Sequence, residues 1–352
     1  MIFDSIKRNI FAIVISCLAI VLVLWGNNLL LPKREVIIPY NPMPLMQLLL
    51  NLFYKDFWIT VILGGLMILI LAILLFRLNE IHLFLTKHEP LLAILFVVLM
   101  STFVSTQYLL SVHFALFFII LSLNCVFRTY RLDYAFSEIF IGSVYLSIAT
   151  LFYAPSIYFL PVLIICLSLM KPVLWRDCVV VIAGLGVPYL FALFYYYFVW
   201  SDFQIPFILF IDNIQFTVPY SLSVFSITEW IYLIYIAVLM LLLIMRFIFT
   251  PAVGNKIKTI RINIVFIWMF FISLLCSIFY SQQSSRENLL LMSLPLSVLL
   301  ANFFSTIRSN RLANVILILL FLSAFAIQIP DSCYVSIGDF FNYIWEFIVE
   351  LF

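Results

Sequence analysis

The sequence predicts an all-α fold: a polytopic transmembrane helical bundle of about 11 spans, with the N-terminus inside and the C-terminus outside. Hydrophobic residues make up 66% of the 352 positions and charged residues 10%, whereas a soluble domain carries about 25% charge. Apolar runs long enough to cross about 30 Å of hydrocarbon recur along the whole chain. Because no long polar stretch separates these runs, we expect residues 1–352 to form a single integral membrane domain.

The spans can be assigned from the apolar runs in chain order. Lys7 and Arg8 precede the first run, which is too long for a signal peptide and has no small-residue cleavage site after it. We therefore interpret it as an uncleaved span. The predicted spans cover residues 9–31, 57–76, 90–109, 112–127, 136–154, 156–170, 178–200, 228–249, 262–280, 289–307 and 312–329.

The basic residues predict the orientation of the bundle. If the N-terminus is inside and the spans alternate in direction, 14 of the 18 Lys and Arg residues fall on inner segments. The positive-inside tendency favours this arrangement over its inverse. Four cations then fall on outer segments, namely Lys33, Arg34, Lys55 and Arg286.

Three short segments of mixed polarity are predicted to lie on the outer face. In the loop 32–56, Pro44 can open a helix whose polar residues recur every four positions, a pattern typical of an amphipathic helix in the membrane interface. The segment 201–227 is also mixed. The C-terminal segment 338–352 carries its acids on one helical face and apolar residues on the other, which predicts a second interfacial helix.

A run of polar residues, "SQQSSREN" at 281–288, interrupts the apolar sequence in a predicted outer hairpin. Arg286 lies there against the positive-inside tendency, and a guanidinium group matches the geometry of phosphate or carboxylate. The run predicts an anion or lipid-phosphate site, with Arg286 as the main contact and the other three outer cations on the opposing wall. The alternative is an ordinary polar turn whose Arg reaches the lipid headgroups.

Other polar residues of the outer face are predicted to support this site. They come from the same hairpin and from the connection between the third and fourth spans, and they are Gln282, Gln283, Ser285, Glu287, Asn288, Gln107 and His113. Glu287 would orient Arg286, while the helix that begins near Asn288 would offer its free N–H groups to the anion. No second His or Cys lies close to His113 in the sequence, so no metal site is predicted, and the cofactor, if any, is unknown.

Three stretches of the sequence carry a resemblance to a known family. The first is "RLNEIHLFLTKHEPLLAILFVVLMS" at 77–101, and the last is "RENLLLMSLPLSVLLANFF" at 286–304. Between them, residues 135–198 contain FYxPS, an apolar span, WR and GxxxPY in that order. Together these stretches resemble an uncharacterised family of bacterial multi-pass inner-membrane proteins. The resemblance implies a helical membrane fold and a location in the bacterial inner (cytoplasmic) membrane, and it implies no chemistry.

The order of the elements carries a second resemblance. The chain begins with one span, continues with an outer loop that contains an interfacial helix, and ends with many further spans. This architecture is similar to that of membrane-embedded glycosyltransferases that use polyprenyl-phosphate donors. That resemblance implies a general base at Asp56 or Glu35 and a lipid-phosphate site formed by the four outer cations. The contiguous acidic pair that those enzymes carry in the first outer loop is missing from this sequence.

Three functions are compatible with these features. The first is a non-catalytic subunit or scaffold of a cell-envelope assembly, with an envelope protein partner at the outer face, because it requires no chemical motif. The second is a glycosyltransferase or polymerase acting on lipid-linked sugars at the outer leaflet, which needs a carboxylate base and cations for the leaving phosphate. The third is a transporter. The expected ligands are membrane lipids, including an isoprenoid-phosphate lipid, and nucleic acid is not expected.

Overall fold

The structure is a computed structural model in which most of the chain is α-helical. It describes residues 10–26, 28, 42–53, 56–85, 89–132, 134–201, 204–214, 226–249, 257–279, 285–307 and 310–329. These residues form thirteen α-helices and two short 3-10 helices, and they include no strand. The prediction of an all-α fold is confirmed.

The described helices are numbered in chain order. The α-helices are α1 (Ile10–Leu24), α3 (Pro44–Phe53), α4 (Phe57–His82), α5 (Glu89–Ser101), α6 (Ser111–Arg128), α7 (Phe136–Phe152), α8 (Leu160–Met170), α9 (Trp175–Trp200), α10 (Ile205–Ile214), α11 (Ile227–Phe249), α12 (Ile257–Phe279), α13 (Ser285–Thr306) and α14 (Asn310–Ala326). The 3-10 helices are η2 (Val104–Thr106) and η3 (Ala154–Phe159).

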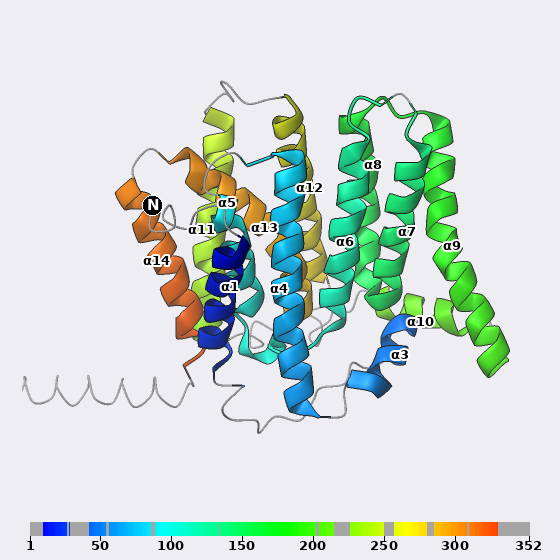
Figure 1. The fold of residues 1–352 in the computed structure, drawn as a ribbon, viewed down its shortest axis with the longest axis horizontal. Helices are drawn as coiled ribbons and strands as arrows, with labels where there is room; N and C mark the ends of the chain where they lie inside the picture. Colours follow the sequence, from blue (N-terminus) through cyan, green and yellow to red (C-terminus); the bar gives the residue numbers. More distant parts are fainter. Residues whose placement is uncertain are drawn as a thin grey trace, which may run out of the picture.

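The long helices stand side by side, so the bundle has two ends (Figure 1). At one of them, α4, α6 and α8 finish and α12 begins. Contacts join these termini, because Arg261 of α12 donates a hydrogen bond to the carbonyl of Leu169 on α8 and Lys258 of α12 contacts His82 of α4. We call this the basic end. At the other, which we call the opposite end, α1, α7 and α14 finish and α4, α6 and α13 begin, and the short helices α3 and α10 lie there (Figure 1).

The core of the bundle is formed by α5 and α13, which pack against each other. Every residue in 91–100 of α5 and in 290–301 of α13 is buried. The helices α1, α4 and α14 pack around α5, while α6, α11 and α12 pack around α13. Residues 91–100 are all apolar, and residues 290–301 are apolar except for Ser293 and Ser297, because no face of either stretch meets the exterior.

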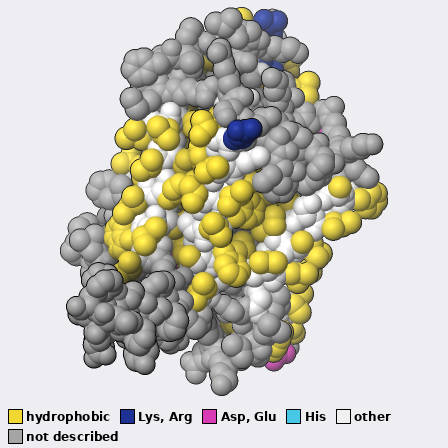
Figure 2. Space-filling view, turned by 90° about the vertical axis from the view of Figure 1, so that its left-hand side faces the viewer, with side chains coloured by type: hydrophobic (Ala, Val, Ile, Leu, Met, Phe, Trp, Pro, Cys, Tyr) yellow, Lys and Arg dark blue, Asp and Glu magenta, His cyan; other side chains and the backbone are white. Residues whose placement is uncertain are grey.

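The exterior of the bundle is apolar as well. Figure 2 shows a broad area of hydrophobic side chains on the side of the molecule that lies at the left of Figure 1. On α9, large apolar residues such as Ile182, Phe191 and Phe198 are 70–79% exposed. An apolar surface of this extent is typical of helices that face lipid. The protein is therefore a helical, membrane-embedded protein.

Five helical segments are long and apolar enough to cross a membrane on their own. They are Phe57–His82, Ser111–Arg128, Trp175–Val199, Ile257–Ser277 and Glu287–Ser305. Each of the eleven predicted spans nevertheless coincides with one helix, from α1 and α4–α9 to α11–α14. The other six helices contribute to the same bundle. The passage of all eleven through the membrane stays a prediction, as does the orientation.

The third predicted span extends too far. We expected a helix over 90–109, but α5 ends at Ser101, and residues 102–110 form an irregular connection that contains η2. Phe103, Leu109 and Leu110 are apolar and buried, which is why hydropathy extends the span through them. The carbonyl of Ser101 accepts a hydrogen bond from the side chain of Gln107 (2.9 Å) where the helix ends, so this buried carbonyl is satisfied outside the helix.

The outer elements that the sequence predicted are described in part. A helix does begin at Pro44 within the loop 32–56, where a proline in the first turn gives up no helical hydrogen bond. The segment 201–227 contains α10. The interfacial helix predicted for 338–352 lies outside the described residues. A contact between the Tyr196 hydroxyl of α9 and Gln47 of α3 (2.6 Å) ties α3 to the bundle.

Candidate functional site

The first turn of α13 carries the predicted anion site, and its best-defined member is Asn288. The side chain of Asn288 is fully buried. Its Oδ1 atom accepts a hydrogen bond from the hydroxyl of Tyr153, which follows the last residue of α7. Its Nδ2 atom has no hydrogen-bond partner in the part of the chain that the structure describes. Within the described residues, two buried N–H donors are therefore left unsatisfied at the start of a helix, where the first backbone N–H groups have no partner inside the helix itself.

Tyr153 is positioned by a local chain reversal at the end of α7. The residue adopts an extended conformation, with φ −143° and ψ 104°, and its N–H caps α7 by donating to the carbonyl of Ala149. Pro155 then opens η3, and the N–H of Ser156 donates to the carbonyl of Tyr153 (3.0 Å). The hydroxyl of Ser156 is buried and has no partner within the described residues. The FYxPS motif therefore directs the hydroxyl of Tyr153 to α13 and buries the hydroxyl of Ser156, three residues later in the sequence.

His113 supplies another unsatisfied donor on a neighbouring helix. It lies in the first turn of α6, which packs against α13, and its ring is fully buried. The N–H of Leu110 donates to Nδ1 of His113 (3.0 Å), so Nδ1 carries no proton and the neutral ring holds its proton on Nε2. Nε2 has no hydrogen-bond partner among the residues described.

Glu287 lies close to Tyr108 of the connection between α5 and α6. Burial raises the pKa of the Tyr108 hydroxyl, and the negative charge of Glu287 raises it further. The backbone of Tyr108 packs against Gly64 of α4, where a Cβ atom would lie 2.7 Å from its carbonyl carbon. We use the name Asn288 site for Tyr108, Tyr153, Glu287 and Asn288, which come from three separate parts of the chain.

Gln107, which the sequence predicts to support the anion site, makes its hydrogen bonds within a separate cluster of amides. Its Oε1 accepts a hydrogen bond from Asn28 (3.0 Å), and its Nε2 lies 3.0 Å from Oε1 of Gln328. The same Nε2 is also within 3.2 Å of the carbonyl of Leu24. We call Asn28, Gln107 and Gln328 the amide junction. It ties the ends of α1 and α14 to the irregular connection after α5, and it satisfies backbone groups that the break in α5 leaves free.

The remaining predicted residues contribute less to the described site. Ser285 and Arg286 lie in the first turn of α13, and the structure describes their backbone only. Outside the described residues lie Lys33, Arg34, Glu35, Lys55, Gln282 and Gln283. The role of Arg286 as the main anion contact, and of the other outer cations as the opposing wall, therefore stays a prediction.

Asp56, the predicted general base, is described and is exposed. It precedes the first residue of α4 in the N-cap position, with φ −127° and ψ 136°, but its side chain makes no capping hydrogen bond. Its carboxylate is therefore exposed at the opposite end of the bundle and does not cap α4. No group of three or more His, Cys, Asp or Glu residues that could hold a metal ion occurs within the described part of the chain.

Sequence reasoning missed several members of these clusters. Aromatic residues make up 18% of the positions in this chain. The sequence around Tyr108 and Tyr153 does not distinguish them from tyrosines that only line the membrane interface. Asn28 and Gln328 do have a local signal, since each is an amide at the end of an apolar run. Their partner cannot be inferred from spacing, because Gln107 lies 79 and 221 residues away from them.

A comparison with known protein families, characterised proteins and solved structures found no match for this chain.

Proposed function

We propose that this protein binds the phosphate-bearing headgroup of a membrane lipid at the Asn288 site and serves as a non-catalytic subunit of a cell-envelope assembly. The observation that carries the proposal is the side chain of Asn288, which is fully buried and holds two N–H donors without a partner among the described residues. Leaving such donors unsatisfied costs about 1–3 kcal/mol. A phosphate oxygen would satisfy them together with the backbone N–H groups of the same turn, which have no partner inside the helix.

The surroundings of Asn288 support a headgroup rather than an apolar ligand. Nε2 of His113 is a further unmatched donor on the adjacent helix, and Arg286 precedes Asn288 by two residues in the first turn of α13. Donors at a helix start favour an anion, since the helix dipole places partial positive charge there. The apolar exterior of the bundle would accommodate the acyl or isoprenoid chain of the same lipid.

The test is binding of a polyprenyl phosphate to the purified full-length protein, measured by native mass spectrometry. We expect Arg286→Ala and Asn288→Ala each to weaken binding about tenfold or more, because each removes a hydrogen-bond donor to a charged group. Arg286→Lys should weaken it as well, since a point charge does not replace a bidentate fork. Arg176→Ala is the matched control, because Arg176 is an exposed arginine of α9 at the basic end. Unchanged affinity in all three site variants would contradict the proposal.

One observation favours a second candidate function, a glycosyltransferase acting on lipid-linked sugars. The exposed carboxylate of Asp56 makes no capping hydrogen bond, so it is available as the general base that such an enzyme requires. In this case Asp56→Asn should abolish sugar transfer from a polyprenyl-phosphate sugar and leave polyprenyl-phosphate binding unchanged. If the wild-type protein binds the lipid and transfers no sugar to any hydroxyl acceptor supplied, the non-catalytic role is favoured.

A further inference from the structure

Three cationic side chains converge on one aromatic ring at the basic end of the bundle. The ring belongs to Tyr130, which lies two residues beyond α6. The guanidinium carbon of Arg131 is 5.3 Å from its centroid, the ammonium nitrogen of Lys258 5.7 Å and the guanidinium carbon of Arg261 5.9 Å. We call Tyr130, Arg131, Lys258 and Arg261 the Tyr130 cluster. Lys258 and Arg261 are three residues apart on α12, so they share one helical face.

Hydrogen bonds fix the two cations of α12. Arg261 donates through Nη1 to the carbonyl of Leu169 at the end of α8 (2.7 Å). Lys258 Nζ lies 3.3 Å from Nδ1 of His82. An ammonium group only donates, so Nδ1 is the acceptor, and Nε2 of His82 then donates to Oδ1 of Asn124 (3.0 Å). Side chains of α4 and α6 and a backbone carbonyl of α8 therefore hold the two cations of α12 in place.

The third cation is held at a cost in backbone energy. Arg131 has a φ of 62°, in the left-handed region that a residue with a Cβ atom seldom adopts. Its N–H donates to the carbonyl of Met170 (3.3 Å), which anchors this conformation against the end of α8. Backbone strain of this kind persists where surrounding structure imposes it, and it is concentrated at functional sites.

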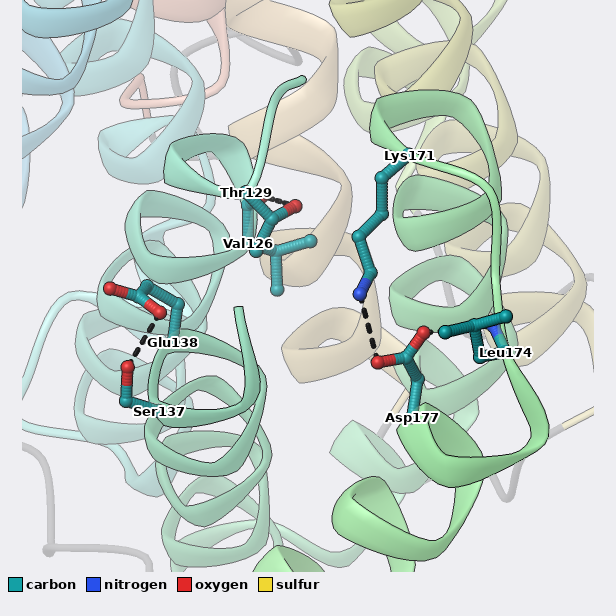
Figure 3. A network of polar contacts seen from close by, with 7 residues as sticks. All are labelled: Val126, Thr129, Ser137, Glu138, Lys171, Leu174 and Asp177. Carbon is teal, nitrogen blue, oxygen red and sulfur yellow. Dashed lines mark hydrogen bonds and ion pairs between the residues drawn. The ribbon is translucent and has the colours of Figure 1, made fainter. Parts of the chain in front are cut away.

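The positive charge of the cluster is not balanced by the residues that the structure describes. In that part of the chain, no ion pair joins a carboxylate to any of its three cations, and Asp133, two residues after Arg131, lies outside the described residues. Asp177, a buried acid at the same end, forms its ion pair with Lys171 instead (2.8 Å; Figure 3). Glu138 accepts a hydrogen bond from Ser137 (Figure 3). Like charges gathered around one ring repel one another, and an anion bound among them would offset this repulsion.

The surroundings of the cluster are apolar. Two apolar residues adjoin the cluster in the sequence, namely Leu132 (43% exposed) and Ile257 (58% exposed). A third, Leu83 (44% exposed), follows His82 at the end of α4. The candidate span Phe57–His82 ends beside the cluster, and the candidate span Ile257–Ser277 begins beside it. The ends of membrane spans lie at the depth of the lipid headgroups. A soluble anion would gain nothing from these exposed apolar side chains, whereas the acyl chains of a lipid would cover them.

We propose that the Tyr130 cluster binds the phosphate of an anionic phospholipid at the basic end of the bundle. Positive charges near a membrane surface attract anionic headgroups, and the guanidinium groups of Arg131 and Arg261 can each contact two phosphate oxygens. This site is separate from the Asn288 site, which lies at the opposite end, and it does not depend on the function proposed for that site.

The experiment measures the affinity of phosphatidylglycerol for the purified full-length protein by native mass spectrometry in a neutral detergent. The double variant K258Q/R261Q should bind about 30-fold more weakly, because each cation near the surface contributes about fivefold. Arg77→Gln is the matched control, since Arg77 is an exposed arginine of α4 outside the cluster, and it should bind as the wild type does. Equal affinity in the double variant and the control would overturn the proposal.

Two further experiments complete the test. The first distinguishes a lipid phosphate from a soluble phosphate, and the second distinguishes a lost contact from a loss of folding. Inorganic phosphate at millimolar concentration should not displace phosphatidylglycerol, and displacement at that concentration would show that the site takes soluble anions instead. Arg131→Gly removes one cation and relieves the left-handed strain, so this variant should bind the lipid about fivefold more weakly while its melting temperature in detergent is unchanged or higher. Undiminished lipid affinity in this folded variant would contradict a phosphate contact by Arg131.

Discussion

The hydroxyl of Tyr153 donates a hydrogen bond to Oδ1 of Asn288, across 135 residues of sequence. The bond joins the end of α7 to the beginning of α13 and determines which edge of the Asn288 amide stays free. Tyr153 is therefore a positioning residue of the proposed headgroup site, whereas Asn288 is a direct contact. The difference between these roles can be measured.

The first prediction is that Tyr153 acts through Asn288. Tyr153→Phe should weaken polyprenyl-phosphate binding several-fold and reduce the free energy of unfolding by about 0.5–1.5 kcal/mol, the net value of one hydrogen bond. In an Asn288→Ala background, the same substitution should cause no further loss of binding, since the amide that it orients is gone. Additive losses of affinity in the double variant would show that Tyr153 contacts the lipid independently.

The second prediction concerns the close approach of two backbones at the opposite end. Gly64→Ala would place a Cβ atom 2.7 Å from the carbonyl carbon of Tyr108 and 2.8 Å from the backbone nitrogen of Leu109. Because these are backbone atoms, the whole connection 102–110 has to shift, and the free energy of unfolding should fall by about 1–3 kcal/mol. The measurement is unfolding in a denaturing detergent.

Gly186→Ala on α9 is the control for that substitution. A Cβ atom at Gly186 would meet nothing within 4 Å, and alanine has a higher helix propensity than glycine by about 0.5–1 kcal/mol. Its stability should therefore equal or exceed that of the wild type. Equal losses at the two glycines would show that the contact with Tyr108 is not what constrains Gly64.

The third prediction concerns the ion pair between Lys171 and Asp177, whose side chains are both fully buried. Asp177 also accepts a hydrogen bond from the N–H of Leu174 (2.9 Å) and so caps α9. Lys171→Met should reduce the free energy of unfolding by about 3–5 kcal/mol, because it leaves a buried carboxylate without its counter-ion.

The double variant K171M/D177N tests the cause of that loss. Asparagine can still accept the hydrogen bond from Leu174 but carries no charge, so the double variant should regain most of the stability that Lys171→Met loses. A double variant less stable than Lys171→Met would mean that the pair contributes through packing or capping rather than through charge.

Hydropathy predicts where the helices lie in the sequence, and it does not predict how the backbone runs between them. Eleven apolar runs coincide with eleven helices, because burial in the bundle and exposure to lipid both demand apolar side chains. Hydropathy does not report backbone geometry, so the predicted span over 90–109 ran through the break at Ser101. The residues that hold this break, Asn28 and Gln328, are brought to Gln107 only by the tertiary fold.

The candidate site was predictable in part for a related reason. Glu287, Asn288 and His113 stand out as polar residues among apolar neighbours, and the structure buries Asn288 and His113 at the same end of the bundle. The hydrogen bond to Asn288 comes from a tyrosine that the sequence presents as one aromatic residue among many. Its partner is set by how α7 and α13 pack, and a single sequence contains no record of that packing.

The fourth prediction concerns the orientation of the bundle, which rests on the distribution of basic residues. In a variant without its native cysteines, Gln204→Cys should react with an impermeant thiol reagent added outside intact cells, and Ile257→Cys should not. Both positions are exposed on the protein, so accessibility within the fold does not decide the result. The reverse labelling pattern would place the basic end outside and overturn the assignment of leaflets.

The most direct test of the headgroup site is a density map of the full-length protein in lipid nanodiscs that contain a polyprenyl phosphate. We predict phosphate density within hydrogen-bond distance of Nδ2 of Asn288, at about 2.7–3.2 Å, with the first turn of α13 directed toward it. A map in which a protein side chain fills that position, so that no phosphate can reach Asn288, would contradict the proposed function.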